Sequence, residues 1–152
     1  MLKKSAVLTI LLASTLSASI AAVADTAPED AKAYRTSVMT TLRGHIGAAS
    51  MYVRELVDDN GFLQAHAEGL ANGARELKHI FPAGSDVDNS EALPAIWEEP
   101  EEFQKAISNA EKATAAFREA VSSGDKAAIA GAFRDVGAAC RGCHDRFRLD
   151  TD

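Results

Sequence analysis

The chain has 152 residues, of which 47% are hydrophobic and 25% are charged, and its formal net charge at pH 7 is −6. This length suits one domain with one hydrophobic core. The acidic balance argues against nucleic acids and anionic membrane surfaces as partners, because both repel a negatively charged protein surface.

The N-terminus has the three features of a secretory signal peptide. Two lysines give a positive start, an apolar run extends from Ala6 to about Leu16, and small residues occupy 22 and 24, where signal peptidase would cut. The apolar run is shorter than the roughly 20 residues that a membrane-spanning helix needs. We therefore predict a cleaved signal peptide at residues 1–24 and a mature domain at residues 25–152, exported to the periplasm and without a membrane span.

Apolar residues then recur at steps of three and four, which predicts helices almost throughout. The first predicted helix starts near Thr26, a candidate N-cap with Glu29 three residues later, and its apolar face extends to Leu56. The segment Asp58–Gly61 is expected to end it. A second helix is predicted from about Phe62 to Ile80.

A long loop separates this pair of helices from a second pair. The segment Phe81–Pro100 is rich in Pro, Gly, Ser and Asp, and we expect its Trp97 to pack back onto the core. The third helix is predicted from Pro100 to Val121, and the fourth carries an apolar stripe that ends at Phe147. Heptad-like stripes joined by mostly short turns predict an all-α, antiparallel four-helix bundle.

The fourth predicted helix carries the pattern Cys-x-x-Cys-His at Cys140, Cys143 and His144. A structural zinc site is disfavoured because it needs four ligands and the chain has no second cysteine pair. A dithiol oxidoreductase is disfavoured because its motif starts a helix after a strand, where the helix dipole lowers the thiol pKa. The pattern is the attachment signature of c-type haem, in which two thiols add to the vinyl groups and the adjacent histidine ligates iron.

With these features the chain resembles the class II c-type cytochromes, which include cytochrome c′. The resemblance covers essentially the whole mature chain and is most specific in the segments Cys140–Arg148 and Pro28–Ala48, with Phe81–Trp97 also typical. It implies an antiparallel four-helix bundle around one covalent haem c with one iron per chain. It also implies a periplasmic homodimer, although the outer faces of the first two helices do not by themselves predict one.

The resemblance assigns roles to five residues, four in the C-terminal segment and one in the first predicted helix. Cys140 and Cys143 would hold the haem, and His144 would be the proximal iron ligand. Arg148 matches a basic residue that the family places near the proximal face, and Arg35 matches an arginine near a haem propionate. Arginine suits a propionate because its planar guanidinium donates two parallel hydrogen bonds.

Two further residues of the first predicted helix, Thr36 next to Arg35 and Met39, are candidate contacts of the haem. Thr36 stands where many members have glutamine, and Met39 matches the residue that faces the iron. In the low-spin branch of the family a methionine there ligates iron, whereas members with Leu or Phe leave the site open to NO or CO. Some five-coordinate members also resemble this chain with an unbound methionine, so the residue type leaves both states open.

We predict a non-enzymatic carrier of single electrons between periplasmic redox partner proteins, with His144 as the proximal ligand and Met39 as the candidate distal ligand. The alternative is a five-coordinate protein that binds NO or CO. A peroxidase is the weakest reading, because no distal His and Arg pair accompanies Met39.

Overall fold

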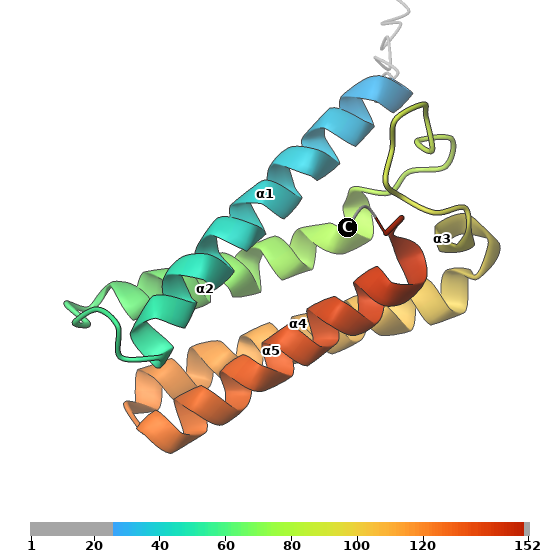
Figure 1. The fold of residues 1–152 in the computed structure, drawn as a ribbon. Coiled ribbons are helices and arrows are strands. Elements are labelled where there is room, and N and C mark those ends of the chain that lie inside the picture. Colours follow the sequence, from blue (N-terminus) through green and yellow to red (C-terminus); the bar gives the residue numbers. More distant parts are fainter. Residues whose placement is uncertain (1–25, 151–152) are drawn as a thin grey trace, which may run out of the picture.

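The structure is a computed structural model, and it describes residues 26–150. Four long helices build it: α1 (Pro28–Val53), α2 (Phe62–Glu76), α4 (Pro100–Ser123) and α5 (Lys126–Phe147). The 3₁₀-helix η1 (Leu77–His79) and the short helix α3 (Ala95–Glu98) lie between α2 and α4. Figure 1 shows successive long helices running in opposite directions, which confirms the predicted all-α antiparallel four-helix bundle.

The helices are not packed equally against one another. α1 packs on α2, α2 on α4, and α4 on α5, whereas α1 and α5 make few direct contacts. Figure 1 shows α1 diverging from α5 toward the N-terminal end of α1. Among the long helices that contact one another, the two that carry the predicted iron ligands are therefore the most loosely packed pair.

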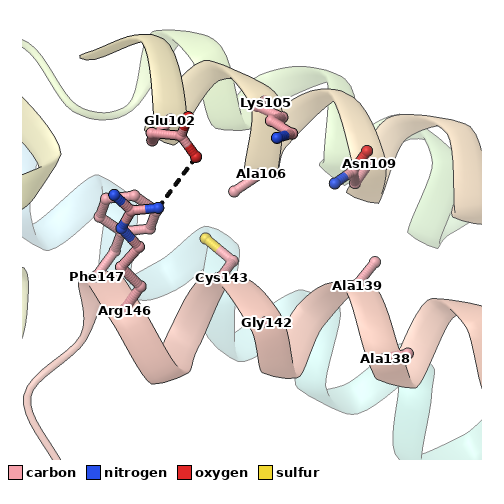
Figure 2. A pocket seen from close by; sticks show the side chains of 10 residues that line it. All are labelled: Glu102, Lys105, Ala106, Asn109, Ala138, Ala139, Gly142, Cys143, Arg146 and Phe147. Carbon is pink, nitrogen blue, oxygen red and sulfur yellow. Dashed lines mark hydrogen bonds and ion pairs between the residues drawn. The ribbon is translucent and has the colours of Figure 1, made fainter. Parts of the chain in front are cut away.

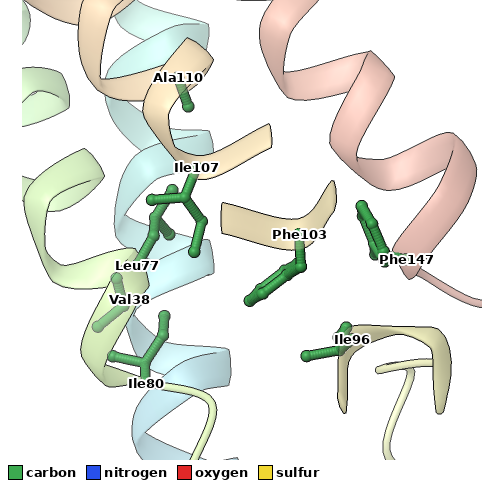
Figure 3. Close-up of a cluster of buried hydrophobic side chains, with 8 residues drawn as sticks. All are labelled: Val38, Leu77, Ile80, Ile96, Phe103, Ile107, Ala110 and Phe147. Carbon is green, nitrogen blue, oxygen red and sulfur yellow. The ribbon is translucent and has the colours of Figure 1, made fainter. Parts of the chain in front are cut away.

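The core consists of two clusters that lie along the bundle. The first joins α1, α4 and α5 to η1 and to the segment between η1 and α4 (Figure 3). In it the rings of Phe103 and Phe147 meet edge-on with their centroids 5.1 Å apart. Its buried members are Val38, Leu77, Ile80, Ile96, Phe103, Ile107, Ala110 and Phe147. The buried members of the second cluster are Ala49, Leu63, Ala67, Leu70, Phe117 and Val136. We call them the first and second core clusters.

The turn between α4 and α5 uses the residues that helix ends favour. Gly124 ends α4 with a φ of 72°, in the left-handed region that favours glycine. Asp125 then caps α5, because its Oδ1 accepts hydrogen bonds from the backbone N–H groups of Ala127 (2.8 Å) and Ala128 (3.1 Å). The sharp reversal puts α5 antiparallel to α4.

Replacing Asp125 with alanine should lower the free energy of unfolding by about 1 kcal/mol, the usual cost of a lost N-cap. Urea unfolding followed by circular dichroism measures this change. The exposed Asp86 in the loop before α3 is not an N-cap, so Asp86→Ala is the matched control and should change stability by less than about 0.5 kcal/mol. Equal effects of the two substitutions would contradict the capping role.

The structure corrects three sequence expectations. α1 ends at Val53, because Glu55 adopts a φ of 56°, so Leu56 lies outside the helix and is exposed. Thr26 is not the N-cap: Ala27 takes that position, and no side chain caps it. The segment predicted as an uninterrupted loop contains α3, which Pro94 precedes as N-cap.

Other expectations are outside or at the edge of what the structure describes. The predicted signal peptide at residues 1–24 lies outside the described residues, and the domain boundary at residue 25 stays a prediction.

The expectation that Trp97 packs on the core is confirmed. Trp97 packs on the first core cluster, and its Nε1 donates to the carbonyl oxygens of Phe81 (3.3 Å) and Pro82 (3.2 Å). Within residues 26–150, no helix has the length and apolar character needed to cross a membrane.

Candidate functional site

The Cys-x-x-Cys-His motif lies in the last turns of α5, where the helix is uninterrupted. Cys140, Cys143 and His144 are each half-buried. Cys143 packs against the first core cluster and Cys140 against the second, so the two sulfurs lie where the two clusters adjoin. Both cysteines are free thiols, and one helical turn separates them.

Burial makes these thiols poor redox groups on their own. It raises the pKa of Cys140, and burial together with the neighbouring Cys140 raises the pKa of Cys143 to about 11. Both thiols are therefore protonated at neutral pH, whereas dithiol oxidoreductases depend on a lowered thiol pKa. The structure thus weighs against the oxidoreductase reading of the motif.

The zinc reading of the motif has no geometric support in the part of the chain that the structure describes. In residues 26–150 no group of three or more His, Cys, Asp or Glu side chains is placed to hold a metal ion. A structural zinc site needs four such ligands.

His144 is held in a form that can ligate iron. Burial lowers its pKa, and the positive charge of Arg148 lowers it further, while Asp145 and Glu91 act in the opposite direction. The imidazole is therefore neutral at pH 7 and keeps a lone pair on one ring nitrogen. Arg148 lies one turn beyond His144, and its backbone N–H donates to the His144 carbonyl oxygen at 3.0 Å.

The chain after α5 is tied to the loop before α3. The Leu93 N–H donates to the Phe147 carbonyl oxygen (3.0 Å), and the Leu149 N–H donates to the Glu91 carbonyl oxygen (2.7 Å). These bonds flank a bridge between Ala92 and Arg148. They fix the C-terminal end of α5, and with it the backbone that presents His144.

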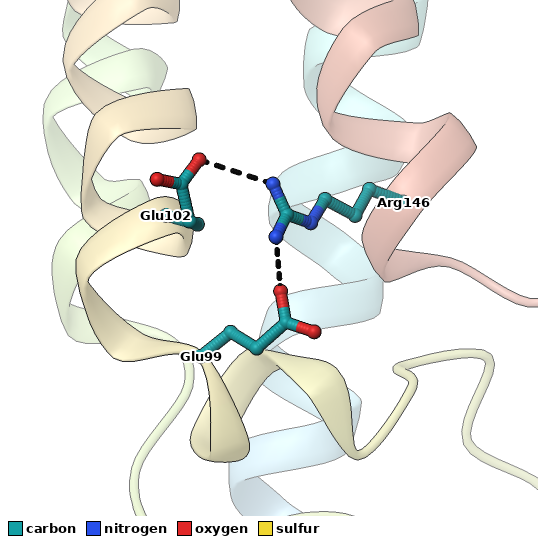
Figure 4. A network of polar contacts seen from close by, with 3 residues as sticks. All are labelled: Glu99, Glu102 and Arg146. Atoms are coloured by element: carbon teal, nitrogen blue, oxygen red, sulfur yellow. Dashed lines mark hydrogen bonds and ion pairs between the residues drawn. The ribbon is translucent and has the colours of Figure 1, made fainter.

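A cavity of about 210 Å³ opens between α4 and α5 beside the motif (Figure 2), and Cys143 points into it. Arg146 pairs with Glu99 and with Glu102 (3.0 Å) at one end of this cavity (Figure 4). The volume is below the roughly 300–1,000 Å³ of sites for drug-sized ligands. A tetrapyrrole at Cys143 needs a larger space. The region between α1 and α5 can provide it, because these two helices pack sparsely against each other.

Arg35 of α1 is 5% exposed, and both terminal nitrogens of its guanidinium donate hydrogen bonds to protein oxygens. Nη1 donates to the Ile80 carbonyl oxygen (3.2 Å) and to Ser85 Oγ (2.9 Å). Nη2 donates to the Ser85 carbonyl oxygen (2.9 Å) and to Ser90 Oγ (3.1 Å). The guanidinium also lies 5.1 Å from the ring centroid of Phe81. Arg35 therefore anchors the loop after η1 to α1, and its contact with a propionate stays a prediction.

Met39 and Thr36 occupy different faces of α1. Met39 is half-buried and packs against the first core cluster, as Cys143 does. Thr36 is exposed, and its Oγ1 donates to the Lys32 carbonyl oxygen (3.0 Å) along the helix. The structure thus brings Met39 and Cys143 to the same cluster, whereas Thr36 is directed away from the core.

Comparison with known proteins gives the family. A family model described as Cytochrome C' matches residues 30–148. The chain belongs to the cytochrome c′ family. The predicted class II c-type cytochrome is therefore confirmed, and so is the predicted cofactor, because cytochromes c′ bind haem c covalently. Two free thiols one turn apart, beside a neutral imidazole, fit that group.

Individual relatives agree with this assignment. Cytochrome c' of Rhodospirillum rubrum is 29% identical over 140 residues, which cover 91% of this chain and 94% of the relative. A cytochrome c-554 of Cereibacter sphaeroides is 50% identical over 72 residues, which cover 45% of this chain and 46% of the relative. The chain thus matches about half the length of this cytochrome c-554.

Solved structures of a cytochrome c′ from Alcaligenes xylosoxidans match nearly over their full length. A nitric oxide complex of one mutant is 29% identical, has a TM-score of 0.76, and is matched over 81% of this chain and 97% of that chain. A carbon-monoxide-bound variant also gives 29% identity and a TM-score of 0.76, over 82% of this chain and 98% of that chain.

Proposed function

We propose that this protein binds a small diatomic gas, NO or CO, on the side of a haem iron opposite His144. The observation that carries the proposal is the likeness to the gas complexes, at a TM-score of 0.76 and over most of both chains. When bound, the haem supplies an iron that coordinates such a gas. The alternative function, gas binding, is therefore better supported than the electron carrier predicted first.

Residues of α5 would hold the haem. The Cys140 and Cys143 thiols would each add across a vinyl group, which forms a thioether and moves the thiol hydrogen to the vinyl carbon without net oxidation. His144 would ligate the iron through its neutral imidazole, and Arg148 would lie near it. The hydrogen bonds that tie Leu93 to Phe147 would keep this end of α5 in place.

Residues of α1 would line the opposite side. Met39, Leu42 and Ile46 are half-buried and follow one face of α1 toward the core clusters. This face is apolar, which suits an uncharged diatomic ligand and excludes charged ones. Of these three residues, only Met39 offers an atom that can ligate iron.

An electron carrier is the second candidate, and the position of Met39 favours it. Met39 packs against the same cluster as Cys143, so its sulfur would be close to a group held at that cysteine. A Met and His ligand pair raises the haem potential. The partners of such a carrier would be periplasmic redox proteins.

The absorption spectrum of the reduced protein with and without CO separates the two functions. Gas binding predicts a broad high-spin spectrum that CO shifts, and a Met39→Leu variant whose CO-free spectrum equals that of the unmodified protein. A sharp low-spin α-band that CO leaves unchanged, and that Met39→Leu converts to a high-spin band, would refute the open site. Met51→Leu is the control, because Met51 is 41% exposed and is not among the residues that form or pack against either core cluster.

We further propose a periplasmic location, as for cytochrome c′ homologues, and a homodimer. Cleavage after Ala24 would leave Asp25 as the first residue, which N-terminal sequencing of the periplasmic fraction tests. Sedimentation equilibrium tests the homodimer, and the mass of a single chain at micromolar concentration would contradict it.

A further inference from the structure

Two histidines from different helices face each other on the α1–α2 side of the bundle. The Nδ1 atoms of His45 on α1 and His66 on α2 lie 3.1 Å apart, and the ring centroids are 5.4 Å apart. Both rings are half-buried. Neither residue belongs to the proposed haem site on α5.

The ring of His45 packs directly over the backbone of Gly69 on α2, where no side chain takes up the space. A Cβ atom at Gly69 would lie 2.4 Å from Nε2 of His45, closer than any real contact, so the ring occupies space that only glycine leaves. On the other side of the pair, the Tyr52 ring lies 6.0 Å from the His66 ring at an angle of 35°. The pair thus packs between Gly69 on one side and Tyr52 on the other.

We propose that His45 and His66 chelate a divalent late transition-metal ion of the zinc and copper class. Two imidazole nitrogens bound to zinc at about 2.0–2.1 Å and at a tetrahedral angle lie about 3.3 Å apart. The 3.1 Å between the two Nδ1 atoms is close to this value. The ion would replace the shared hydrogen bond once each ring has turned so that its lone pair points at the ion rather than at the other nitrogen. Imidazole is a preferred ligand of zinc, copper and nickel.

The protonation of the pair is compatible with metal binding. Burial, and then the nearby His66, lowers the pKa of His45, so that ring is neutral at pH 7. The hydrogen bond between the rings needs one Nδ1 proton, which would leave to solvent or move to Nε2 when the metal binds.

The remaining coordination positions would hold water. In residues 26–150 no third His, Cys, Asp or Glu side chain joins these two as a possible ligand. A site with two protein ligands and open positions exchanges its ion more readily than a closed four-ligand structural site. This chemistry points to reversible metal binding rather than to a metal required for folding.

Isothermal titration calorimetry of the untagged, haem-loaded protein with Zn²⁺ tests the proposal. We expect one ion per chain, and His66→Gln should raise the dissociation constant at least about tenfold. His79→Gln is the matched control, because His79 is exposed on η1 and outside the pair, and its dissociation constant should equal that of the unmodified protein. Absence of Zn²⁺ binding, or equal binding by His66→Gln, would overturn the proposal.

A second variant tests the geometry without removing an imidazole. Gly69→Ala keeps both histidines but forces the His45 ring out of its place, so it should also weaken Zn²⁺ binding at least about tenfold. Circular dichroism and the haem spectrum report whether this variant is folded, and alanine favours the helix at this position. Unchanged affinity in folded Gly69→Ala would show that the observed pair is not the metal site.

Discussion

A variant with alanine at both Cys140 and Cys143 should contain no covalently bound haem. The two thiols are the only ones in the chain, and they lie one turn apart on the half-buried face of α5. Without them the porphyrin has no thioether partner, so acidified acetone should extract essentially all of it. Extraction of the purified protein, followed by absorption of both phases, measures this loss.

Two controls separate attachment from ligation. Each single cysteine variant should retain haem through one thioether and resist extraction. His144→Ala should also retain covalent haem, but with an altered spectrum, because it removes the predicted proximal ligand and leaves both thiols. Covalent haem in the double cysteine variant would contradict the attachment site.

Arg35→Met should lower the free energy of unfolding by about 3 kcal/mol. The guanidinium donates hydrogen bonds to the Ile80 carbonyl oxygen, to both Ser85 oxygens and to Ser90 Oγ. Removing it strands buried acceptors, each of which costs about 1–3 kcal/mol, partly offset by water and by relaxation of the loop. Urea unfolding of the haem-loaded protein measures the change.

Arg75 provides the matched control for Arg35. It is exposed on α2, and its Nη2 donates to Asn72 Oδ1 (2.7 Å) one turn away, so Arg75→Met should cost less than about 0.5 kcal/mol. Arg35→Lys keeps the charge but not the fork, and should recover only part of the stability. A loss below about 1 kcal/mol in Arg35→Met would contradict its anchoring role.

The same Arg35 variants test the predicted propionate contact. If Arg35 also bonds a propionate, Arg35→Lys should shift the haem reduction potential as well as the stability. An unchanged reduction potential would contradict the propionate contact, and the hydrogen bonds to the loop after η1 would then be the role of Arg35.

Sequence periodicity predicted the four long helices because each buries a continuous apolar stripe, and such stripes are local features. Helix ends and short helices, which depend on the backbone conformation of single residues, were predicted less well. The end of α1 at Val53 follows from the left-handed conformation of Glu55, which the apolar pattern around Leu56 does not signal. The short α3 has too few residues to show a helical period.

The residues of the candidate site also differ in whether they could be predicted from local sequence. Cys140, Cys143 and His144 lie within two turns of one helix, so their grouping could be predicted from spacing alone. The partners of Arg35 are 45 to 55 residues away, and nothing in the sequence links Ser85 or Ser90 to it.

The pair of His45 and His66 was also missed, because the two residues are 21 positions apart in the sequence. Only the antiparallel packing of α1 on α2, with Gly69 opposite His45, brings the two rings together. Such contacts between distant residues require the tertiary structure.

The coordination state of the resting ferric iron tests the proposed function most directly. Electron paramagnetic resonance of the purified native protein should show high-spin ferric haem, with His144 as the one axial protein ligand and the side facing Met39 open. A low-spin six-coordinate signal that Met39→Leu abolishes would contradict the account.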